Sequence, residues 1–539
     1  MTTPDPIAAA YLEHHAEYRP VDLSFMGLPG HDHRLPPTAA GTEGAERAGI
    51  ARLRALLDSA GGADGTGARL DRRITASQLS LTEAALDRLP RFANPAWYTG
   101  EAAFAIIGLL LPSGRPTPAD AVRARLDALS DFLADGRTRL RTAAAPAALA
   151  ARAGREARAT AAFLRNGLRL HPDYDSAWAM PAERAATAFE AFDAALADLP
   201  DAPSAAGRDH IELLMRDAHG FDFGMDEALR RAQAAFDTLG DELVERARRR
   251  DPARSWQAQV AELSEQTPAS PDAVLDLCRT LDTRARRAAD RLVTPADEYG
   301  LDYRWLSPDF IDVAGPLYFL PYRSPPAGAA GSGSPYWITP LASGGEVQAY
   351  LRANSETAVK VIHAVHHGSI GHHTQNARAR AAASTLARVG GTDCALGLAF
   401  LSSGTMVEGW ACYVQDLLRE APGFYSELEE MFLVQQQRRN AASVLVDIRL
   451  HTGEWTLAEA AAFYRDEAGF APARVEAEVT RNVMLPGTRL MYWLGTEAIL
   501  DLRRRWTGDT RAFHDTLIGY GHVPIAWAGD EMALAGKLG

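Results

Sequence analysis

The sequence predicts a mainly α-helical protein with a few short strands, and three observations support this fold class. Apolar residues recur at helical spacing in nearly every segment between Gly41 and about Asp290. Prolines and aromatic residues then gather between Tyr299 and Tyr336, where short strands are expected. Beyond Tyr336 the helical pattern returns and continues to the end of the 539-residue chain.

The first predicted helix runs from about Asp5 to Tyr18. Pro6 stands in its first turn, where the missing backbone N–H costs nothing, and apolar side chains follow at helical spacing. The next segment, from Phe25 to Pro37, is rich in glycine and proline and is predicted to be a loop.

Long amphipathic helices are predicted through the following two hundred or so residues, separated by clusters of Gly, Pro and Asp. Their predicted bounds are Glu46 to Ser59, Pro118 to Thr142, Ala145 to Leu168, Pro181 to Leu199 and Ile211 to Arg249. The apolar run from Ala102 to Leu111 is shorter than the roughly 18 residues that a membrane span needs, so it is predicted to be a buried helix.

The chain is longer than a single compact core usually supports, so two lobes are expected. We predict a helical N-terminal lobe over residues 1–298 and a helical lobe with a metal site over residues 299–539, packed as one interdependent unit. A short strand is expected at Tyr336-Trp-Ile-Thr-Pro, and the aromatic segment around Tyr303 offers a second strand or a wall for a substrate.

Charge and composition exclude several classes of partner. The formal net charge is −13, and the basic residues are almost all arginines, with Lys360 and Lys537 as the only lysines. An acidic chain without a basic arm repels phosphate backbones, so no nucleic-acid partner is expected. No signal peptide or membrane span is visible, and three widely spaced cysteines suit packing in a reducing compartment. These observations predict a cytoplasmic protein with no membrane partner.

The densest chemical signal is the stretch from His363 to His373, which holds five of the fifteen histidines. Clustered imidazoles usually indicate a metal site or proton transfer. Ser355 is expected to cap a helix that runs through about His367, with His363 and His367 four residues apart on one face.

Two glycines, Gly368 and Gly371, are expected to end this helix, so that His372 or His373 can fold back toward His366. A further ligand is expected from Glu408, on a helix from Met406 to about Glu420. Two imidazoles and one carboxylate with an open position are typical of catalytic zinc and also suit ferrous iron.

Other interpretations of the same residues are simpler. Glu408 could be an ordinary surface carboxylate of its helix, and the histidines could form a hydrogen-bonded network without a metal. Ser369 lies in a segment similar to the nucleophile elbow of serine hydrolases, but His367 stands where that motif needs Gly, and no strand clearly precedes it.

Four blocks of the sequence resemble the bacterial family named domain of unknown function 885 (DUF885). Its motifs are H-E-x-x-P-G-H-H-x-Q, E-G-W-A-L-Y, V-D-x-G-x-H-x-x-x-W and E-V-x-R-Y followed by P-G-Q-A, Tyr and Gly. The similar segments here are His366 to Gln375, Glu408 to Tyr413, Val446 to Trp455 and Glu478 to Gly495. Their order and spacing agree from about Ser307 to Arg505, and a weaker similarity covers Gly27 to Pro36.

The resemblance implies a large multi-helix fold related to zinc metallopeptidases. It also implies that the metal ligands are His366, Glu408 and either His372 or His373. A second alignment would pair His363 with His367 as an H-x-x-x-H motif. Only the alignment that begins at His366 also matches Gly371-His-His and Glu408 to the family.

Several positions depart from the family pattern. His367 stands where the family has the glutamate that would act as general base, and Ile370 replaces the family's proline. Gln415, Asn482 and Thr488 replace an acid, a tyrosine and a glutamine. A neutral His367, with an ordinary pKa of about 6.5, could take over the role of base. As an additional ligand, it would instead favour iron or copper over hydrolytic zinc.

We therefore predict a metal-dependent enzyme that acts on a small amino-acid- or peptide-like substrate, with a site diverged from peptide hydrolysis, such as a biosynthetic tailoring enzyme. The expected cofactor is a divalent ion, zinc first and iron or copper as alternatives, bound by His366, His372 and Glu408. The other expected roles are proton transfer by His367 and His373, and substrate orientation or charge stabilisation by His451, Arg481 and Tyr492. The alternatives are a metallopeptidase or amidase with His367 as base, and an inactive homologue that acts as a binding protein.

Overall fold

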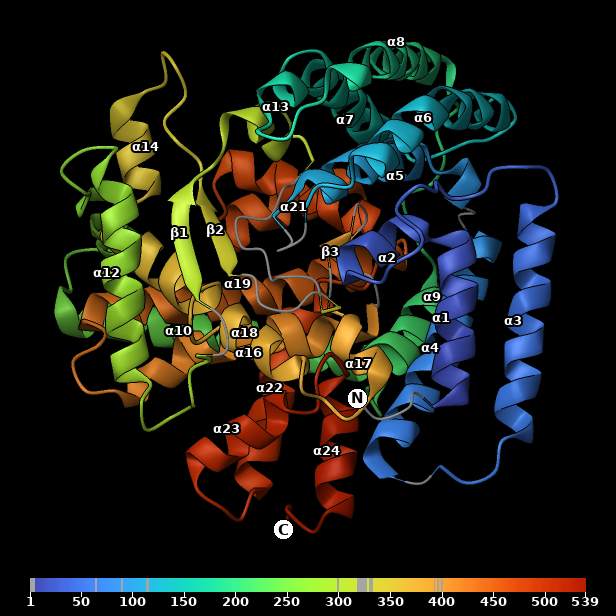
Figure 1. Cartoon of the computed structure of the whole chain (residues 1–539). Coiled ribbons are helices and arrows are strands. Elements are labelled where there is room, and N and C mark those ends of the chain that lie inside the picture. Colours follow the sequence, from blue (N-terminus) through green and yellow to red (C-terminus); the bar gives the residue numbers. More distant parts are fainter. Residues whose placement is uncertain are drawn as a thin grey trace.

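A computed structural model describes residues 5–63, 65–88, 91–112, 116–297, 300–317, 327–328, 333–391, 393–394, 397–398 and 401–539. Over these residues the chain is mainly helical, with two pairs of short strands (Figure 1). The predicted fold class is therefore confirmed.

The first four helices are α1 (Pro6–Tyr18), α2 (Pro20–Met26), α3 (Thr42–Ser59) and α4 (Gly65–Arg88). The predicted first helix is confirmed, and the Asp5 side chain caps it by accepting a hydrogen bond from the Ile7 N–H at 2.9 Å. The predicted loop begins at Gly27 rather than at Phe25, because α2 continues through Met26 and ends where Gly27 adopts a left-handed φ of 71°.

Four longer helices form a separate layer, seen across the top of Figure 1. They are α5 (Pro95–Leu110), α6 (Ala119–Leu140), α7 (Ala147–Arg165) and α8 (Ala179–Ala195). The predicted helices in this region are confirmed, with bounds a few residues shorter at their C-terminal ends. In α5 every residue except Gly108 is buried. Large aromatic and aliphatic side chains of the four helices pack in one core, together with side chains of α2 and of residues 306–317 and 337.

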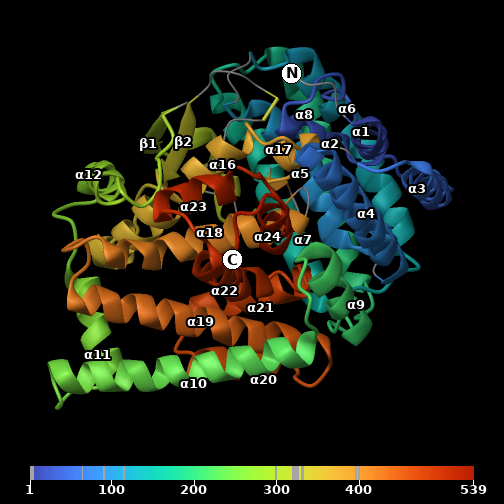
Figure 2. The same ribbon diagram turned by 90° about the horizontal axis from the view of Figure 1, so that it is seen from below.

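The predicted helix from Ile211 to Arg249 is wrong as one element. The structure divides it into α9 (Arg208–Leu213), a π-helical turn η5 (Leu214–Ala218) and α10 (Met225–Arg250). The chain turns between them at Gly220, whose φ of 70° lies in the left-handed region that favours glycine. The long helix α10 then packs along α19 (Glu427–His451), as Figure 2 shows.

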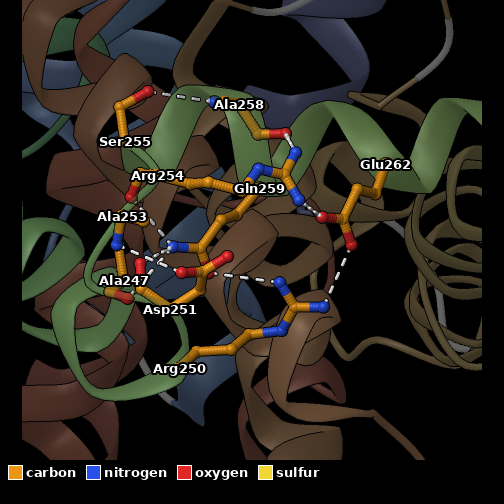
Figure 3. A network of polar contacts seen from close by, with 9 residues as sticks. All are labelled: Ala247, Arg250, Asp251, Ala253, Arg254, Ser255, Ala258, Gln259 and Glu262. Atoms are coloured by element: carbon orange, nitrogen blue, oxygen red, sulfur yellow. Dashed lines mark hydrogen bonds and ion pairs between the residues drawn. The ribbon is translucent and has the colours of Figure 1, made fainter.

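The buried side-chain amide of Gln259 links the end of α10 to the short helix α11 (Trp256–Val260) (Figure 3). Gln259 donates from Nε2 to the carbonyl oxygens of Ala247, Asp251 and Arg254, each at 3.0 Å. Its Oε1 accepts from Arg250 at 3.2 Å. These bonds satisfy carbonyls that a helix terminus otherwise leaves without partners.

Two strands lie against α12 (Ala273–Ala288), which precedes them in the chain. Strands β1 (Leu301–Trp305) and β2 (Ser334–Ile338) pair in parallel, with Leu301 opposite Ser334 and Trp305 opposite Ile338. The strand expected at Tyr336 is thus confirmed. A second pair, β3 (Asp393–Cys394) and β4 (Gly397–Leu398), is antiparallel.

The remaining elements are helical. They are α13 (Ile311–Ala314), α14 (Val347–Ala353), α15 (Glu356–Ala358), the π-helix η8 (Val359–His366), α16 (His372–Ala379), α17 (Thr385–Val389), α18 (Gly404–Leu417), α20 (Leu457–Ala462), the π-helix η11 (Phe463–Glu467), α21 (Pro472–Met484), α22 (Leu490–Arg505), α23 (Thr510–Ile518) and α24 (Ile525–Leu534). Short 3-10 turns link several of them: η1 (Arg91–Ala93), η2 (Gly167–Leu170), η3 (Ser176–Trp178), η4 (Leu196–Asp198), η6 (Ala261–Glu265), η7 (Pro308–Phe310), η9 (Leu401–Ser403) and η10 (Leu418–Glu420).

The largest core joins distant parts of the chain. Apolar side chains of α1, α3 and α4 pack in one cluster with those of α18, α22 and α24. The first and last thirds of the chain therefore share a core. The predicted lobe boundary between residues 298 and 299 stays a prediction.

Two thiols, Cys278 and Cys412, are free and buried, which agrees with the packing role expected for the cysteines. Among the described residues, no helix combines the length and the apolar character that crossing a bilayer requires.

Candidate metal centre

The helix that carries the first histidines is confirmed in extent, but its form is different from the prediction. Ser355 caps it by accepting a hydrogen bond from the Ala358 N–H. The chain then widens into the π-helix η8, and the N–H of His367 donates to the carbonyl of Ile362, five residues back, at 3.0 Å. Single π-turns often occur at functional sites, because the extra residue per turn changes which side chains face a neighbour.

His363 lies apart from the group of histidines that can hold an ion. Its Nδ1 is 2.6 Å from the hydroxyl of Tyr336 on β2, and its carbonyl accepts a hydrogen bond from Tyr303 on β1 at 3.1 Å. Burial lowers the pKa of His363 to about 4, so its ring is neutral near pH 7. The strands β1 and β2 are thus joined to η8 through hydrogen bonds at His363.

Two glycines let the chain reverse directly after the helix. A Cβ on Gly368 would lie 2.1 Å from the Ala364 carbonyl oxygen, and one on Gly371 would lie 1.9 Å from that of His366. Any other residue at either position would clash with backbone. The predicted break at these glycines is therefore present, and its cause is close approach of the backbone.

Ser369, at the centre of this turn, is held by Asp282 of α12. Its N–H donates to Asp282 Oδ1 at 2.8 Å and its hydroxyl to Oδ2 at 2.6 Å. The hydroxyl is buried and engaged with a carboxylate, so its role is to fix the turn. The serine-hydrolase interpretation finds no support in these contacts.

The turn brings His372, the first residue of α16, back to the end of η8. Ligand atoms of His366, His367 and His372 all lie within 4.8 Å of one another. Glu408 Oε2 lies 3.4 Å from His366 Nε2 and 3.9 Å from His372 Nε2. Ligands about 2.0–2.1 Å from a tetrahedral ion are about 3.3–3.4 Å apart, so these donors need only small shifts to hold one.

Glu408 has the surroundings expected of a metal ligand. Its Oε2 is buried and faces the Nε2 atoms of His366 and His372. Burial alone would raise the pKa of this carboxyl, but the contact with His366, the His372 ring and the guanidinium of Arg489 lower it to about 2. A buried carboxylate that stays charged and faces two imidazoles fits a bound cation.

Gln415 lies on α18, two helical turns after Glu408, and contacts the imidazole of His366. Its amide Nε2 lies 3.3 Å from His366 Nδ1 and donates to the Val361 carbonyl oxygen at 3.4 Å. An NH2 group is a donor, so these contacts hold the imidazole of His366 through its Nδ1 side and leave the Nε2 side facing Glu408.

His367 is a poor candidate for a strong base. Burial lowers its pKa well below the ordinary value, and the neighbouring His366 and His372 lower it further. A general base works best with a pKa near the working pH. The neutral ring therefore suits metal ligation better than proton abstraction.

Comparison with known proteins places the chain in a family. The family described as "Bacterial protein of unknown function (DUF885)" matches residues 20–532. The chain belongs to the DUF885 family. The resemblance inferred from the four sequence blocks is thus confirmed over nearly the whole chain. No curated protein matches it.

Two solved structures share the fold. One is described as "a putative lipoprotein of unknown function from Shewanella oneidensis", with 17% identity and a TM-score of 0.78, covering 98% of this chain and 99% of that chain. The other is "the putative lipoprotein from Colwellia psychrerythraea", with 16% identity, the same TM-score and the same coverage. At this level of identity the similarity shows the fold alone.

The remaining residues predicted for the DUF885 site occupy different places. His373 is buried beside the turn, where its N–H donates to the Gly368 carbonyl. His451 is fully buried, with Nδ1 3.2 Å from the Ala206 N–H and Nε2 2.9 Å from the Asn482 carbonyl oxygen. Both ring nitrogens of His451 thus contact main chain, and Nε2 also lies 3.4 Å from Asp447 Oδ1, which favours a structural role.

Arg481 and Tyr492 lie on α21 and α22. Arg481 reaches Glu478 at 3.4 Å and remains partly exposed. The pKa of Tyr492 is raised by burial, with Glu408 among the charged groups near it. Tyr492 therefore lies beside the candidate metal centre, and its predicted role in the site stays a prediction.

Three residues near the centre were missed from sequence: Asp282, Tyr336 and Arg489. The first two act through contacts with residues far away in the chain, which no local pattern reveals. Arg489 did leave a signal, because it stands where the family block P-G-Q-A has alanine.

Proposed function

We propose that the protein is a metal-dependent enzyme that acts on a small amino-acid- or peptide-like substrate. The observation that carries this proposal is the group His366, His367 and His372, whose ligand atoms lie within 4.8 Å of one another, with a buried Glu408 oxygen 3.4 and 3.9 Å from two of these rings. Such a donor set is costly to bury without a cation, which supports a functional reason for it.

The ion would be held by His366, His372 and Glu408. A divalent metal there supplies Lewis-acid chemistry, which polarises a carbonyl, an amine or an oxidant. Zinc is the expected ion for this set, and iron or copper becomes the better fit if His367 also binds. The neutral His367 ring supports the second arrangement.

The chain's own residues favour chemistry other than ordinary peptide hydrolysis. A hydrolytic metallopeptidase needs a carboxylate that takes the proton of water and passes it to the leaving amine. His367 occupies that place here, and its lowered pKa makes it a weak base near neutrality. The positions of Gln415 and the turn instead hold the ligand rings in fixed orientations.

The second candidate is a metallopeptidase or amidase with His367 as base, and the third is an inactive homologue that binds a ligand. The second is favoured only by the place of His367 between two ligand rings, whose centroids lie 4.6 and 5.1 Å from its own. Dipeptide hydrolysis by the wild-type protein would support it over the diverged enzyme.

A direct test incubates the full chain, loaded with zinc or ferrous iron and exposed to air, with a panel of amino acids and dipeptides, and follows all products by mass spectrometry. We expect metal-dependent conversion of at least one compound, lost with a chelator and reduced about 100-fold or more in Glu408→Gln, as for removal of a transition-state contact. The exposed Glu476→Gln is the matched control and should keep wild-type turnover.

Absence of any conversion by protein that holds its ion would overturn the enzyme proposal and favour the binding protein. The predicted cytoplasmic location can be tested in the same cells. Because both similar structures are described as putative lipoproteins, fractionation should ask whether the chain remains in the supernatant, as predicted, or sediments with membranes.

A further inference from the structure

Arg489 is a buried cation next to the candidate metal centre. It precedes α22, directly after Thr488 and the turn at Gly487, and only 6% of its surface is exposed. Its main-chain N–H donates to Asp447 Oδ2 at 3.1 Å, which fixes the backbone at this point. The guanidinium carbon lies 4.9 Å from the ring centroid of Tyr492.

Part of the hydrogen-bonding capacity of this guanidinium is unused. Nη1 donates to Glu478 Oε2 at 3.3 Å, whereas Nε is buried and has no hydrogen-bond partner among the described residues. A buried donor without a partner costs free energy, so a group that satisfies it is expected. The guanidinium fork is suited to a planar anion such as a carboxylate, which it binds through two parallel bonds.

The carboxylate that Arg489 contacts is shared with other arginines. Glu478 is shared among three arginines, with Arg474 at 2.6 Å, Arg481 at 3.4 Å and Arg489 at 3.3 Å. A second carboxylate nearby is Asp447, which also accepts from Asn482. Glu478 is thus only partly available to Arg489, and Glu408, another carboxylate whose pKa Arg489 lowers, faces the histidines. A buried guanidinium with an unpaired Nε therefore remains able to attract an anion.

This positive group lies on the side of the site where α18 crosses α22. The two helices touch through Gly409 and Gly495, since a Cβ on Gly409 would lie 2.8 Å from the Gly495 Cα. Glu408 comes directly before one glycine, and Tyr492 lies one helical turn before the other. Arg489 and Tyr492 both interact electrostatically with Glu408, which agrees with a position beside the carboxylate that faces the histidines.

We propose that Arg489, stacked on Tyr492, binds a carboxylate group of the substrate, while the reacting group lies toward Glu408 and the histidines. This rests on the proposed function, because it names the substrate class of the same site: amino acids or peptides with a free carboxylate. Arg489 stands where the DUF885 motif has alanine, so the anion site belongs to this chain's specificity.

The test measures binding of N-acetyl-L-alanine and of its uncharged amide to the full chain by calorimetry, with and without added zinc. We expect the acid to bind at least about tenfold more tightly than the amide, a difference of about 1.4 kcal/mol. Arg489→Ala should remove this preference and Arg489→Lys should weaken it, because lysine keeps the charge but loses the paired donors.

Arg474→Ala is the matched control, since Arg474 shares Glu478 but is half exposed, and it should keep the preference. Equal binding of acid and amide by the wild-type protein, or equal loss in Arg474→Ala and Arg489→Ala, would overturn the proposal. Tighter binding of inorganic phosphate than of the acid would overturn the carboxylate assignment. If Arg489→Ala does not fold, Arg489→Lys carries the test.

The binding experiment distinguishes failure of the anion site from failure of the proposed metal-dependent function. Loss of the acid preference with metal binding intact removes only the anion site. If the protein prefers the acid but binds no metal, the anion-site proposal stands and the proposed metal-dependent function is wrong.

Discussion

At the scale of single residues, the histidine site depends on two positions that carry no side chain. A Cβ at Gly371 would lie 1.9 Å from the His366 carbonyl oxygen and 2.3 Å from that of Val365. Backbone oxygens cannot move aside as a flexible side chain can. Gly371 thus determines whether His372 reaches the end of the π-helix.

Gly371→Ala should therefore lower the free energy of unfolding by at least about 2 kcal/mol, as expected for overpacking in a filled interior. It should also weaken metal binding, because His372 moves with the turn. Urea unfolding and metal titration measure the two effects. Gly44→Ala is the control, since Gly44 is exposed in α3 with no atom within 4 Å of a new Cβ, and it should be neutral or stabilising. Equal behaviour of the two variants would contradict this account.

The sequence identified the residues whose chemistry is visible in the residue type itself. His366, Glu408 and His372, with His373 as its alternative, could be proposed because imidazoles are dense in this stretch and because the segments resemble the DUF885 motifs. Asp282 could not, because its partner Ser369 lies 87 residues further on and nothing local marks the contact. The structural contacts of His451 were equally hidden, since its partners are main-chain groups of distant segments.

At the scale of elements, apolar spacing predicted where helices lie but not their hydrogen-bond register. The helix after Ser355 was expected, yet η8 is a π-helix, with the His367 N–H bound five residues back. An extra residue in a turn leaves the apolar pattern nearly unchanged. The orientation of His363 toward Tyr336 therefore could not be derived from the four-residue spacing to His367.

The break before α10 is a second case in which apolar spacing did not show how a helical segment is divided. The apolar pattern is continuous across Gly220 and Gly224, so it predicted one helix from Ile211 to Arg249. The left-handed φ of Gly220 ends the first piece. The close crossing of α18 and α22 at Gly409 and Gly495 was likewise invisible from sequence, because it is a property of two distant helices.

At the scale of the whole molecule, burial keeps several imidazoles neutral. Burial lowers the pKa values of several histidines, among them to about 4 for His219, His363, His372 and His514 and to about 3 for His522. The same groups in the unfolded chain titrate near 6.5. Between pH 6.5 and 4 the unfolded chain therefore binds more protons than the folded protein.

The free energy of unfolding of the metal-free protein should consequently fall as pH falls from 6.5 to 4, by about 1.4 kcal/mol per pH unit for each net proton. Asp416, whose pKa burial raises to about 6, acts in the opposite direction but contributes one proton against several histidines. Urea unfolding at pH 7.5 and pH 5 should show a lower midpoint at pH 5. An equal or higher midpoint there would contradict the neutral burial of these rings.

The central claim is that this chain holds a metal ion between η8, α16 and α18. Its most direct test is elemental analysis of the full chain after equilibration with zinc and removal of free ions. The wild-type protein and His33→Ala, which removes an exposed histidine, should each hold about one ion per chain, as expected for a mononuclear site. His372→Ala and Glu408→Ala should each hold less than about a tenth of an ion, since a site with one ligand missing releases it. A wild-type value below a tenth of an ion, or full occupancy in both variants, would contradict the claim.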